Sequence, residues 1–556
     1  MEDKRTLLAF LIIGLILLGM PYYFELLGVS KTSPARQTQT PTSEPAPARS
    51  ADQPAIQVPP TEAILLAQPA PASQAVDFVP RQVVVHTPLQ RLVLSTAGGT
   101  LVSAQLQLYH KQPGEPVELV PAGGKGLVLA LKNGDSVLDL SAVAFAPDKE
   151  DLRLGPGEEA SLRMQADLGE GRLVEKVLRF HGDRYGIGLT VRLSGFQEDT
   201  EALLTWYKGI GVAEKRPEID LSEMRALAYM NGELTEFRIK EKEEEPLEDK
   251  GPLRWVGVRN KYFVSAMAFQ EEEQLRFKLS GRPAEPGAPE YSHQVGLRIG
   301  PAGTWTSTVY LGPMDYEKLA YYQVDLERAM SLGWPVVREV SKLLIIVFMA
   351  LHEYVPNYGW VIVVFSLVVK VLVYPLTHKS YESAAKMQEV QPKISALREK
   401  YKKDNQRLSK ETMKLYKEAG VNPLGGCLPM LLQMPIFFAL YQVFSSTIEL
   451  RQAPFILWIS DLSLPDEVMI GGFGLHVLPL LMALSMMVQQ KMTMKDPRQA
   501  ALVYLMPAFM VFIFWKLSSG LVLYWTVFNV LTIAQQWLIE YLKRRQAPPA
   551  PLVVRR

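Results

Sequence analysis

Hydrophobic residues follow several distinct patterns along this chain of 556 residues. The first apolar stretch, 6–24, comes directly after Lys4 and Arg5, as in a membrane-spanning helix or a secretory signal. No small-x-small cleavage motif closes it, so we expect an uncleaved transmembrane anchor at 1–28, with a cleaved signal as the alternative. Residues 29–77 are rich in Pro, Ala, Thr, Ser and Gln, which predicts a disordered linker outside the cytoplasm.

From 79 to 313 the pattern changes to short runs in which apolar and polar residues alternate. The runs 91–95 and 101–108 are examples, and the turn dipeptides Gly98-Gly99, Asn133-Gly134 and Asn231-Gly232 separate such runs. Alternation with a period of two is typical of strands that have one buried face. We therefore predict a β-sandwich domain at 78–325.

The region 326–355 is predicted to contain an interfacial amphipathic helix. Its purely apolar part, 343–351, is too short to cross about 30 Å of hydrocarbon. Charged residues flank this part: Arg338, Glu339, Lys342 and Glu353. We expect the helix to lie along the outer membrane surface, and a spanning helix is the alternative.

Five later apolar stretches have the composition of transmembrane helices: 358–377, 424–446, 475–490, 502–517 and 520–541. Lys and Arg crowd the intervening segments 378–422 and 491–498 and follow the last stretch at 543–545. Basic residues are enriched on the cytoplasmic side of membranes, so these segments should be cytoplasmic. With the anchor, this gives a multi-pass protein with six transmembrane helices. Its five-helix core is 356–545, both termini are cytoplasmic, including the tail 546–556, and the β-domain lies on the other side.

Composition and motifs exclude several functional classes. The formal net charge of +1 argues against a broadly basic nucleic-acid binder, and the single cysteine, Cys427, excludes an intrachain disulfide. No phosphate-binding P-loop occurs, His352-Glu353 lacks the second histidine of a zinc-protease motif, and the seven histidines are not spaced as metal pairs. We expect a protein that is not an enzyme and that has no metal site and no cofactor.

Lys370 is the most informative single residue, because it lies inside a predicted span, roughly 10 Å from its cytoplasmic end at 1.5 Å per residue. A lysine in hydrocarbon is costly, so its ammonium group either faces a hydrated interior or reaches the headgroups. Polar residues in the same and other spans favour a hydrophilic groove: Ser366, Gln433, Asn529, Thr532 and Gln536. Taken singly, each is equally compatible with hydrogen bonding between helices. Tyr524 and Trp525 either border the groove or belong to an aromatic belt.

Segment 378–422 is predicted to be a helical hairpin with its turn at 402–405, because apolar residues recur on both sides at steps of three and four. Pro392 should kink the first helix or begin a new one. The hairpin presents many basic residues, among them Lys393, Arg398, Lys400, Lys402, Lys403 and Arg407. They could contact ribosomal RNA, anionic headgroups or an incoming chain, or simply follow the charge rule for cytoplasmic loops.

Several motifs in order resemble the YidC family of membrane protein insertases. They are Tyr374-Pro375-Leu376-Thr377, Asn422-Pro423-Leu424-Gly425-Gly426-Cys427, Gln433-Met434-Pro435-Ile436-Phe437, Glu449-Leu450-Arg451-Gln452-Ala453-Pro454-Phe455 and Ser519-Gly520-Leu521-Val522-Leu523-Tyr524. The resemblance covers about 330–545 and implies a groove that is open to cytoplasm and lipid and holds one positive charge. Lys370 stands where bacterial relatives typically have arginine. Met434 and Phe437, which belong to the third of these motifs, are also expected to line the groove.

The resemblance also implies a cellular setting. The anchor, linker and β-domain are similar to the form of the family found in bacteria with two membranes, so we expect an inner-membrane protein with a periplasmic β-domain. Implied partners are nascent membrane proteins, the Sec translocon, the ribosome, signal recognition components and the lipid bilayer. A small-solute transporter and a purely structural assembly chaperone are the alternatives.

Overall fold

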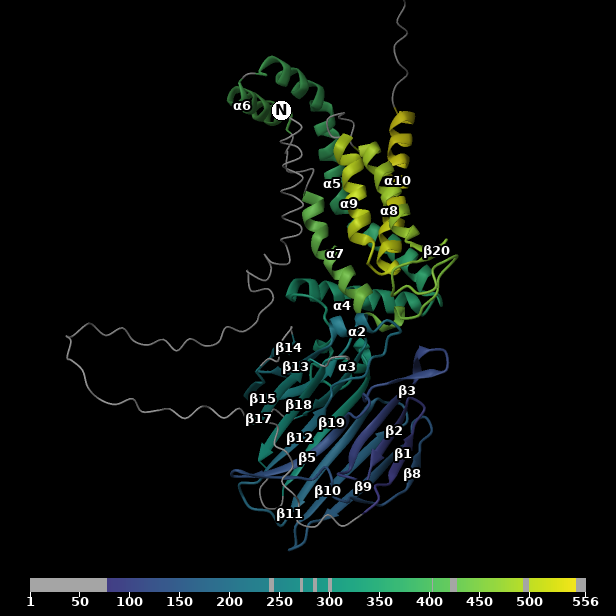
Figure 1. The fold of residues 1–556 in the computed structure, drawn as a ribbon. Coiled ribbons are helices and arrows are strands. Elements are labelled where there is room, and N and C mark those ends of the chain that lie inside the picture. Colours follow the sequence, from purple (N-terminus) through teal and green to yellow (C-terminus); the bar gives the residue numbers. More distant parts are fainter. Residues whose placement is uncertain are drawn as a thin grey trace, which may run out of the picture. The chain divides into compact units, whose positions relative to one another are not determined.

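The computed structural model describes residues 78–239, 245–270, 274–283, 288–298, 303–402, 404–420, 428–493 and 500–546. Tertiary contacts divide the chain into two compact units, Met1–Gly312 and Pro313–Arg556 (Figure 1). The predicted anchor 1–28, the linker 29–77 and the tail beyond residue 546 lie outside the described residues.

The described part of the first unit is built almost entirely of β-strands (Figure 1). Its short helix is α2 (Pro217–Glu223), which begins at a proline in its first turn. The strands are β1 (Gln82–His86), β2 (Gln90–Ser95), β3 (Thr100–Gln112), β4 (Glu115–Glu118), β5 (Lys125–Asn133), β6 (Ser136–Asp139), β7 (Ala146–Pro147), β8 (Asp151–Arg153), β9 (Glu159–Asp167), β10 (Leu173–His181), β11 (Gly186–Ser194), β12 (Glu201–Tyr207), β13 (Arg225–Met230), β14 (Glu233–Phe237), β15 (Leu247–Arg259), β16 (Phe263–Ala268), β17 (Gln274–Arg282), β18 (Glu290–Arg298) and β19 (Thr304–Pro313).

Most strand pairs are antiparallel, and the long strand β15 joins two groups of strands. Its first half pairs with β17, which continues through β18 and β12 to β5. Its second half pairs with β13 and β16. A further antiparallel series runs β9–β10–β11–β19, and β1 pairs in parallel with β8. The arrangement confirms a large β-rich domain, and the description of this domain as a β-sandwich stays a prediction.

Apolar side chains that alternate along these strands form the core of the first unit. Along β10, for example, Val174, Leu178 and Phe180 are buried. The side chains of Trp206, Trp255 and Trp305 are also buried, one from each of three different strands. The division between the units falls after Gly312, near the end of β19, and the predicted domain bounds 78–325 stay a prediction.

A lysine occupies this core. Lys176 shares the inward-facing register of Val174 and Leu178 and is fully buried. Its Nζ donates hydrogen bonds to the carbonyl oxygens of Gly98 (2.7 Å), Gly99 (3.2 Å) and Leu127 (2.7 Å). It also lies 5.1 Å from the centre of the Phe145 ring. Burial lowers the pKa of Lys176 to about 7. The Lys176 amine therefore joins β10 to the turn at Gly98-Gly99 and to β5.

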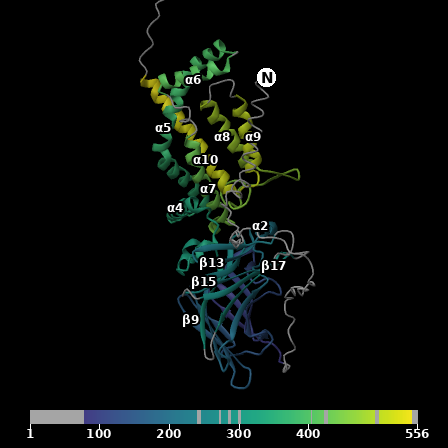
Figure 2. The same cartoon turned by 90° about the vertical axis from the view of Figure 1, so that its left-hand side faces the viewer.

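The second unit consists mainly of helices, and both views show α5, α8, α9 and α10 side by side (Figure 2). Its longer helices are α4 (Pro335–His352), α5 (Tyr358–Lys400), α6 (Asn405–Glu418), α7 (Leu428–Ser446), α8 (Val477–Thr493), α9 (Ala500–Phe514) and α10 (Ser519–Gln546). Shorter elements are α3 (Tyr316–Ala320), the 3-10 helices η1 (Leu326–Ala329) and η3 (Ile448–Leu450), and the hairpin of β20 (Val468–Ile470) and β21 (Phe473–Leu475).

Helix α4 corresponds to the predicted interfacial helix. It begins at Pro335, which is suited to a first helical turn because a proline has no backbone N–H to donate. One face packs against α5 and α7 and buries Val337, Ser341, Leu344, Ile345 and Phe348. Val336, Leu343 and Ile346 are exposed. Apolar side chains therefore lie on both faces, and the position of α4 at the membrane surface stays a prediction.

Apolar helical segments overlap each of the five predicted C-terminal spans. Within the described residues, Ser519–Ile539 is the segment long and apolar enough to cross a membrane by itself. Shorter apolar segments occur at Tyr358–Tyr374, Met434–Ser446, Val477–Met492 and Val503–Phe514. The segment positions agree with the hydropathy pattern, while the number of crossings stays a prediction.

Helix α5 continues without interruption from its apolar part to Lys400. Pro392 lies within it, so no new helix begins there. Helix α6 packs back against its end, where Val390 and Ile394 are buried against Leu415 and Tyr416. The turn lies between Lys400 and Asp404, whose side chain caps α6. The side chains of 375–389 and all of Lys403 lie outside the described residues.

Candidate functional site

Lys370 lies in the apolar part of α5, and its side chain is directed toward α10. The residue is 8% exposed, and its Nζ donates a 2.6 Å hydrogen bond to Thr532 Oγ1. The same ammonium group lies 4.6 Å from the centre of the Phe528 ring. Both contacts are with neutral groups. They stabilise the cation by a dipole and by the negative face of a ring, without neutralising its charge.

Helix α10 carries further buried polar residues on the face that meets α8. Asn529 is buried, and its Nδ2 donates to Ser485 Oγ of α8 (3.3 Å). Ser485 Oγ in turn donates to the carbonyl of Met482 (2.6 Å). Asn529 and Thr532 are one helical turn apart, so α10 is bonded through neighbouring side chains to both α5 and α8. Ser485 was not predicted, although a hydroxyl inside an apolar stretch was a sequence signal for it.

The side-chain amide of Gln535 is also buried on α10, but it differs from Asn529 and Thr532 in its hydrogen bonding. Its Nε2 and Oε1 are both buried, and neither has a hydrogen-bond partner among the described residues. Gln490 Oε1 on α8 is likewise buried and has no hydrogen-bond partner among the described residues. Buried amides without a protein partner are costly unless water or a ligand satisfies them. Gln535 follows Thr532 by three residues and therefore lies close to the same helix face.

The remaining predicted groove residues have different surroundings. Ser366 is fully buried, one turn before Lys370, and its Oγ donates to the Ile362 carbonyl of its own helix (2.7 Å). Gln536 and Met434 are half-buried. The side chain of Gln433 lies outside the described residues.

Packed aromatic rings come before Asn529 and Thr532 along α10. Tyr524 is buried, with ring centroids at 5.8 Å from Phe528, 6.3 Å from Phe365 and 6.1 Å from Phe444. Trp525 packs edge-on against Phe437 at 5.3 Å. These rings fill the space between α5, α7 and α10 with apolar atoms. Along α10 the buried polar side chains Asn529 and Thr532 come after these rings.

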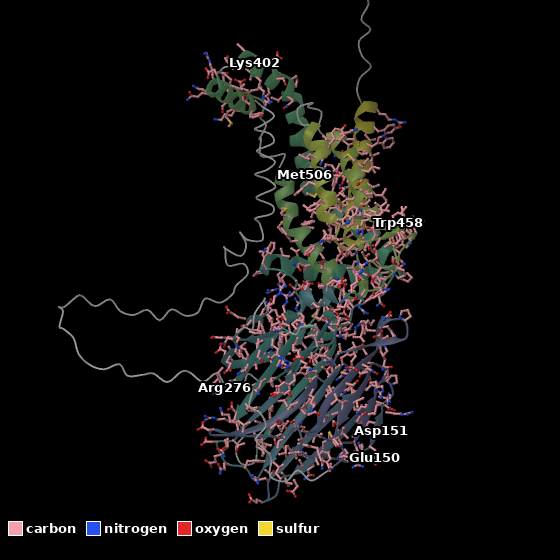
Figure 3. All side chains as sticks on the ribbon, viewed as in Figure 1. Glu150, Asp151, Arg276, Lys402, Trp458 and Met506 are labelled. Carbon is pink, nitrogen blue, oxygen red and sulfur yellow. The ribbon has the colours of Figure 1, made fainter. Side chains whose placement is uncertain are left out.

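Basic residues surround the tip of the α5–α6 pair, where Figure 3 labels Lys402. Tyr401 is at the centre, with Lys400 Nζ at 5.4 Å and the Arg407 guanidinium at 5.5 Å from its ring centre. The described basic side chains that were predicted for this region are all exposed: Lys393, Arg398, Lys400, Lys402 and Arg407. These side chains give the tip an exposed set of positive charges.

Asp466 organises the loop between α7 and α8, near Trp458, which is labelled in Figure 3. It is 4% exposed, and its Oδ2 accepts hydrogen bonds from Trp458 Nε1 (3.0 Å) and from the backbone N–H of Leu478 (2.8 Å). Its backbone carbonyl also contacts His476 Nδ1. The carboxylate therefore satisfies a backbone donor in the first turn of α8 and fixes the loop to that helix.

Replacing Asp466 with alanine should lower the free energy of unfolding by about 2 kcal/mol, because one buried and one partly buried donor lose their carboxylate acceptor. Thermal unfolding of the full-length protein in detergent would measure the change. Asp466→Asn is the matched control, since it keeps the shape and one oxygen, and it should have a smaller effect. Equal stability of Asp466→Ala and the unaltered protein would contradict the capping role.

Among the described residues, no group of three or more His, Cys, Asp and Glu side chains is placed to hold a metal ion.

Sequence comparisons identify relatives across nearly the whole chain. The profile of the 60Kd inner membrane protein family matches residues 350–546, and that of the YidC periplasmic domain matches 82–344. The membrane protein insertase YidC of Chlorobaculum parvum is 33% identical over 566 residues, covering 97% of this chain and 94% of that protein. That of Geobacter sulfurreducens is 35% identical, covering 82% and 85%.

A solved structure described as an active YidC insertase with the first transmembrane domain resolved is 19% identical, with a TM-score of 0.36. It covers 82% of this chain and 92% of that one. The profiles and relatives assign a periplasmic domain and a membrane region to an inner-membrane protein. The chain therefore belongs to the YidC family of membrane protein insertases.

Proposed function

We propose that this protein inserts transmembrane segments of other proteins into the inner membrane through a hydrophilic groove around Lys370. The observation that carries the proposal is a cluster of buried polar side chains between otherwise apolar helices. Lys370 and Thr532 are bonded to each other, and the Gln535 amide has no partner among the described residues. Such groups favour water or a polar peptide over lipid.

The charge of Lys370 supplies attraction for the substrate. An extracytoplasmic tail that carries Asp or Glu would enter the groove from the cytoplasm, drawn by the ammonium group. Movement of negative charge outward is favoured by the membrane potential, at about 2.3 kcal/mol per charge per 100 mV. Burial of the substrate's apolar helix in lipid then drives its release. The sequence of events requires no covalent chemistry and no cofactor.

A lysine and an arginine would serve this role differently. Arginine presents a planar fork that can bind a carboxylate through two hydrogen bonds, whereas lysine acts as a point charge. In this chain Lys370 already donates to Thr532, so a substrate carboxylate would compete with a hydroxyl for the ammonium protons. We therefore propose a transient attraction and not a fixed binding site.

The proposal includes a topology. The N-terminal anchor and five later helices cross the membrane, the five form the core 356–545, and both termini are cytoplasmic. α4 lies on the outer surface, and the α5–α6 pair is cytoplasmic. The apolar segments of α5, α7, α8, α9 and α10 support the crossings. The exposed basic side chains at the α5–α6 tip support its cytoplasmic side.

Partners follow from this arrangement as proposals. The clients are nascent membrane proteins, and the bilayer receives them. The basic α5–α6 tip is suited to ribosomal RNA, to signal recognition components or to anionic headgroups, all of which present phosphates or acidic surfaces. Cooperation with the Sec translocon would serve clients that have several transmembrane segments.

Reconstitution of the purified protein alone into liposomes tests the function. A single-span substrate made in the presence of these liposomes should acquire a protease-protected tail, whereas empty liposomes should give no more than the spontaneous level. Substrate that binds but remains fully digestible would indicate a structural chaperone. Solute flux without tail protection would indicate a transporter.

A further inference from the structure

The hairpin of β20 and β21 exposes apolar side chains in the loop that leads into α8. Val468 pairs with Leu475 and Ile470 with Phe473, in antiparallel register. The two turn residues, Gly471 and Gly472, have φ angles of 58° and 84°. Positive φ at both central positions is the geometry of the two-residue turn that best fits the twist of a hairpin, and glycine adopts it without strain.

The tip of this hairpin is unusually apolar for a projecting turn. Met469 is 64% exposed, Ile470 59% and Phe473 65%. A short two-stranded hairpin is at best marginally stable in water. Large apolar groups gathered on an exposed element mark a surface that contacts another molecule or a membrane.

The neighbouring helix indicates what covers the tip. β21 ends at Leu475, and α8 begins at Val477. Exposed apolar side chains continue along the membrane segment of α8 at Leu480, Leu481, Leu484 and Val488. In Figure 1 the β20 label lies beside the lower ends of α8 and α10, at the margin of the helical unit. The apolar surface of the hairpin is therefore continuous in sequence with a surface that faces lipid in an inner-membrane protein.

Within the segment 466–475, charged residues are confined to the base of the hairpin. Asp466 is bonded to Trp458 and to the first turn of α8, which fixes the start of β20 to the start of that helix. Glu467 is exposed, directly before β20. From Val468 to Leu475 the sequence carries no charged residue. Carboxylates at the base with apolar groups at the tip match the gradient from water to the boundary between headgroups and acyl chains.

We propose that the β20–β21 hairpin inserts its tip into the outer leaflet of the membrane and anchors the outer end of α8 there. At about 3.3 Å per residue, a strand of this length reaches roughly 10 Å. Interfacial elements bury their apolar groups to about 5–10 Å, so the reach is sufficient. The occupant of the apolar surface is phospholipid. The proposal rests on the membrane location of the helical unit and, for the choice of leaflet, on the proposed topology, and it does not depend on insertion activity.

Depth-dependent quenching in the full-length protein tests the proposal. In a Cys427→Ser background, Phe473→Cys is labelled with an environment-sensitive fluorophore, and Glu467→Cys at the base is the matched control. Both are reconstituted into phosphatidylethanolamine–phosphatidylglycerol vesicles with iodide on both sides. The label at 473 should be quenched by nitroxides placed high on the acyl chain, about twofold or more beyond the control, and protected from iodide. The label at 467 should show the reverse.

Two outcomes would overturn the proposal. A label at 473 as open to iodide as the control would place the tip in water, and a label shielded from both quenchers would place it against protein. Ile470→Cys gives a second reporter on the opposite strand and guards against a local effect of one label. Unchanged near-ultraviolet circular dichroism would show that each labelled variant is folded, so every result bears on the hairpin.

Discussion

Replacing Lys370 with glutamate should reduce the insertion of a single-span substrate with a short acidic tail about tenfold or more. At an effective dielectric constant near 20, two unit charges about 8 Å apart interact by roughly 2 kcal/mol, so reversing one of them changes attraction into repulsion. A loss of about 1.4 kcal/mol already corresponds to a factor of ten. Protease protection of the tail in proteoliposomes measures the effect.

The controls for this prediction separate charge from structure. Lys370→Arg keeps the positive charge and should retain most insertion, whereas Lys370→Met keeps the apolar stem, removes the charge and should give an intermediate loss. Thr532→Val removes the hydroxyl that accepts from Lys370 but leaves the charge in place. It should therefore cause a smaller loss than charge reversal. A substrate with a neutral tail should be almost indifferent to all four variants.

Equal insertion of acidic-tailed substrate by Lys370→Glu and the unaltered protein would contradict attraction by charge. The hydrophilic groove itself would still be testable through the polar residues of α8 and α10. Replacing Asn529 with leucine, for example, would remove the bond to Ser485 and one polar wall at the same time.

The stability of the β-rich unit should rise with pH between about 7 and 10, relative to the same unit with Lys176→Met. Burial lowers the pKa of Lys176 from 10.5 in the unfolded chain to about 7 in the folded unit. Between these two values the unfolded chain holds a proton that the folded unit has released. Raising the pH therefore favours the folded state, by about 1.4 kcal/mol per pH unit. Below about pH 7 both states are protonated, and the dependence on pH disappears.

Urea unfolding of a fragment spanning 78–312, followed by tryptophan fluorescence at pH 6 and pH 9, measures this dependence. Buried tryptophans such as Trp206 and Trp255 report on the core directly. Lys125→Met is the matched control, since it removes an exposed amine on β5 and should leave the slope unchanged. Parallel pH profiles for the unaltered fragment and Lys176→Met would show that the buried amine does not titrate in this range.

Several features of the candidate site could be read from the sequence. The spacing i, i+3 and i+7 puts Asn529, Thr532 and Gln536 on one face of a helix, and Lys370 is recognisable as a cation inside an apolar stretch. The structure adds that Thr532 is the residue that bonds Lys370, across 162 positions of sequence. Helical periodicity identifies the face of a helix that is polar, but it does not identify the neighbouring helix or the atom that is met.

For Lys176, two sequence signals disagree. The alternating pattern of its strand predicts a buried position, whereas the residue type suggests an exposed one. It lies in register with Val174, Leu178 and Phe180, and the alternation alone puts all four on one face of β10. A lysine on a strand is ordinarily taken as exposed, because a buried amine is costly without partners. The partners are three carbonyl oxygens from other parts of the chain, which come together only in the folded unit.

The sequence by itself determined where the elements lie and which segments are apolar, because periodicity and hydropathy are local properties of the chain. It also identified the charged tip and the cation at 370. Only the tertiary structure decided which side chains meet: Lys370 with Thr532, Asn529 with Ser485, and Asp466 with α8. These pairings depend on how helices pack, and packing is decided by the shapes of many side chains at once, which no local pattern records.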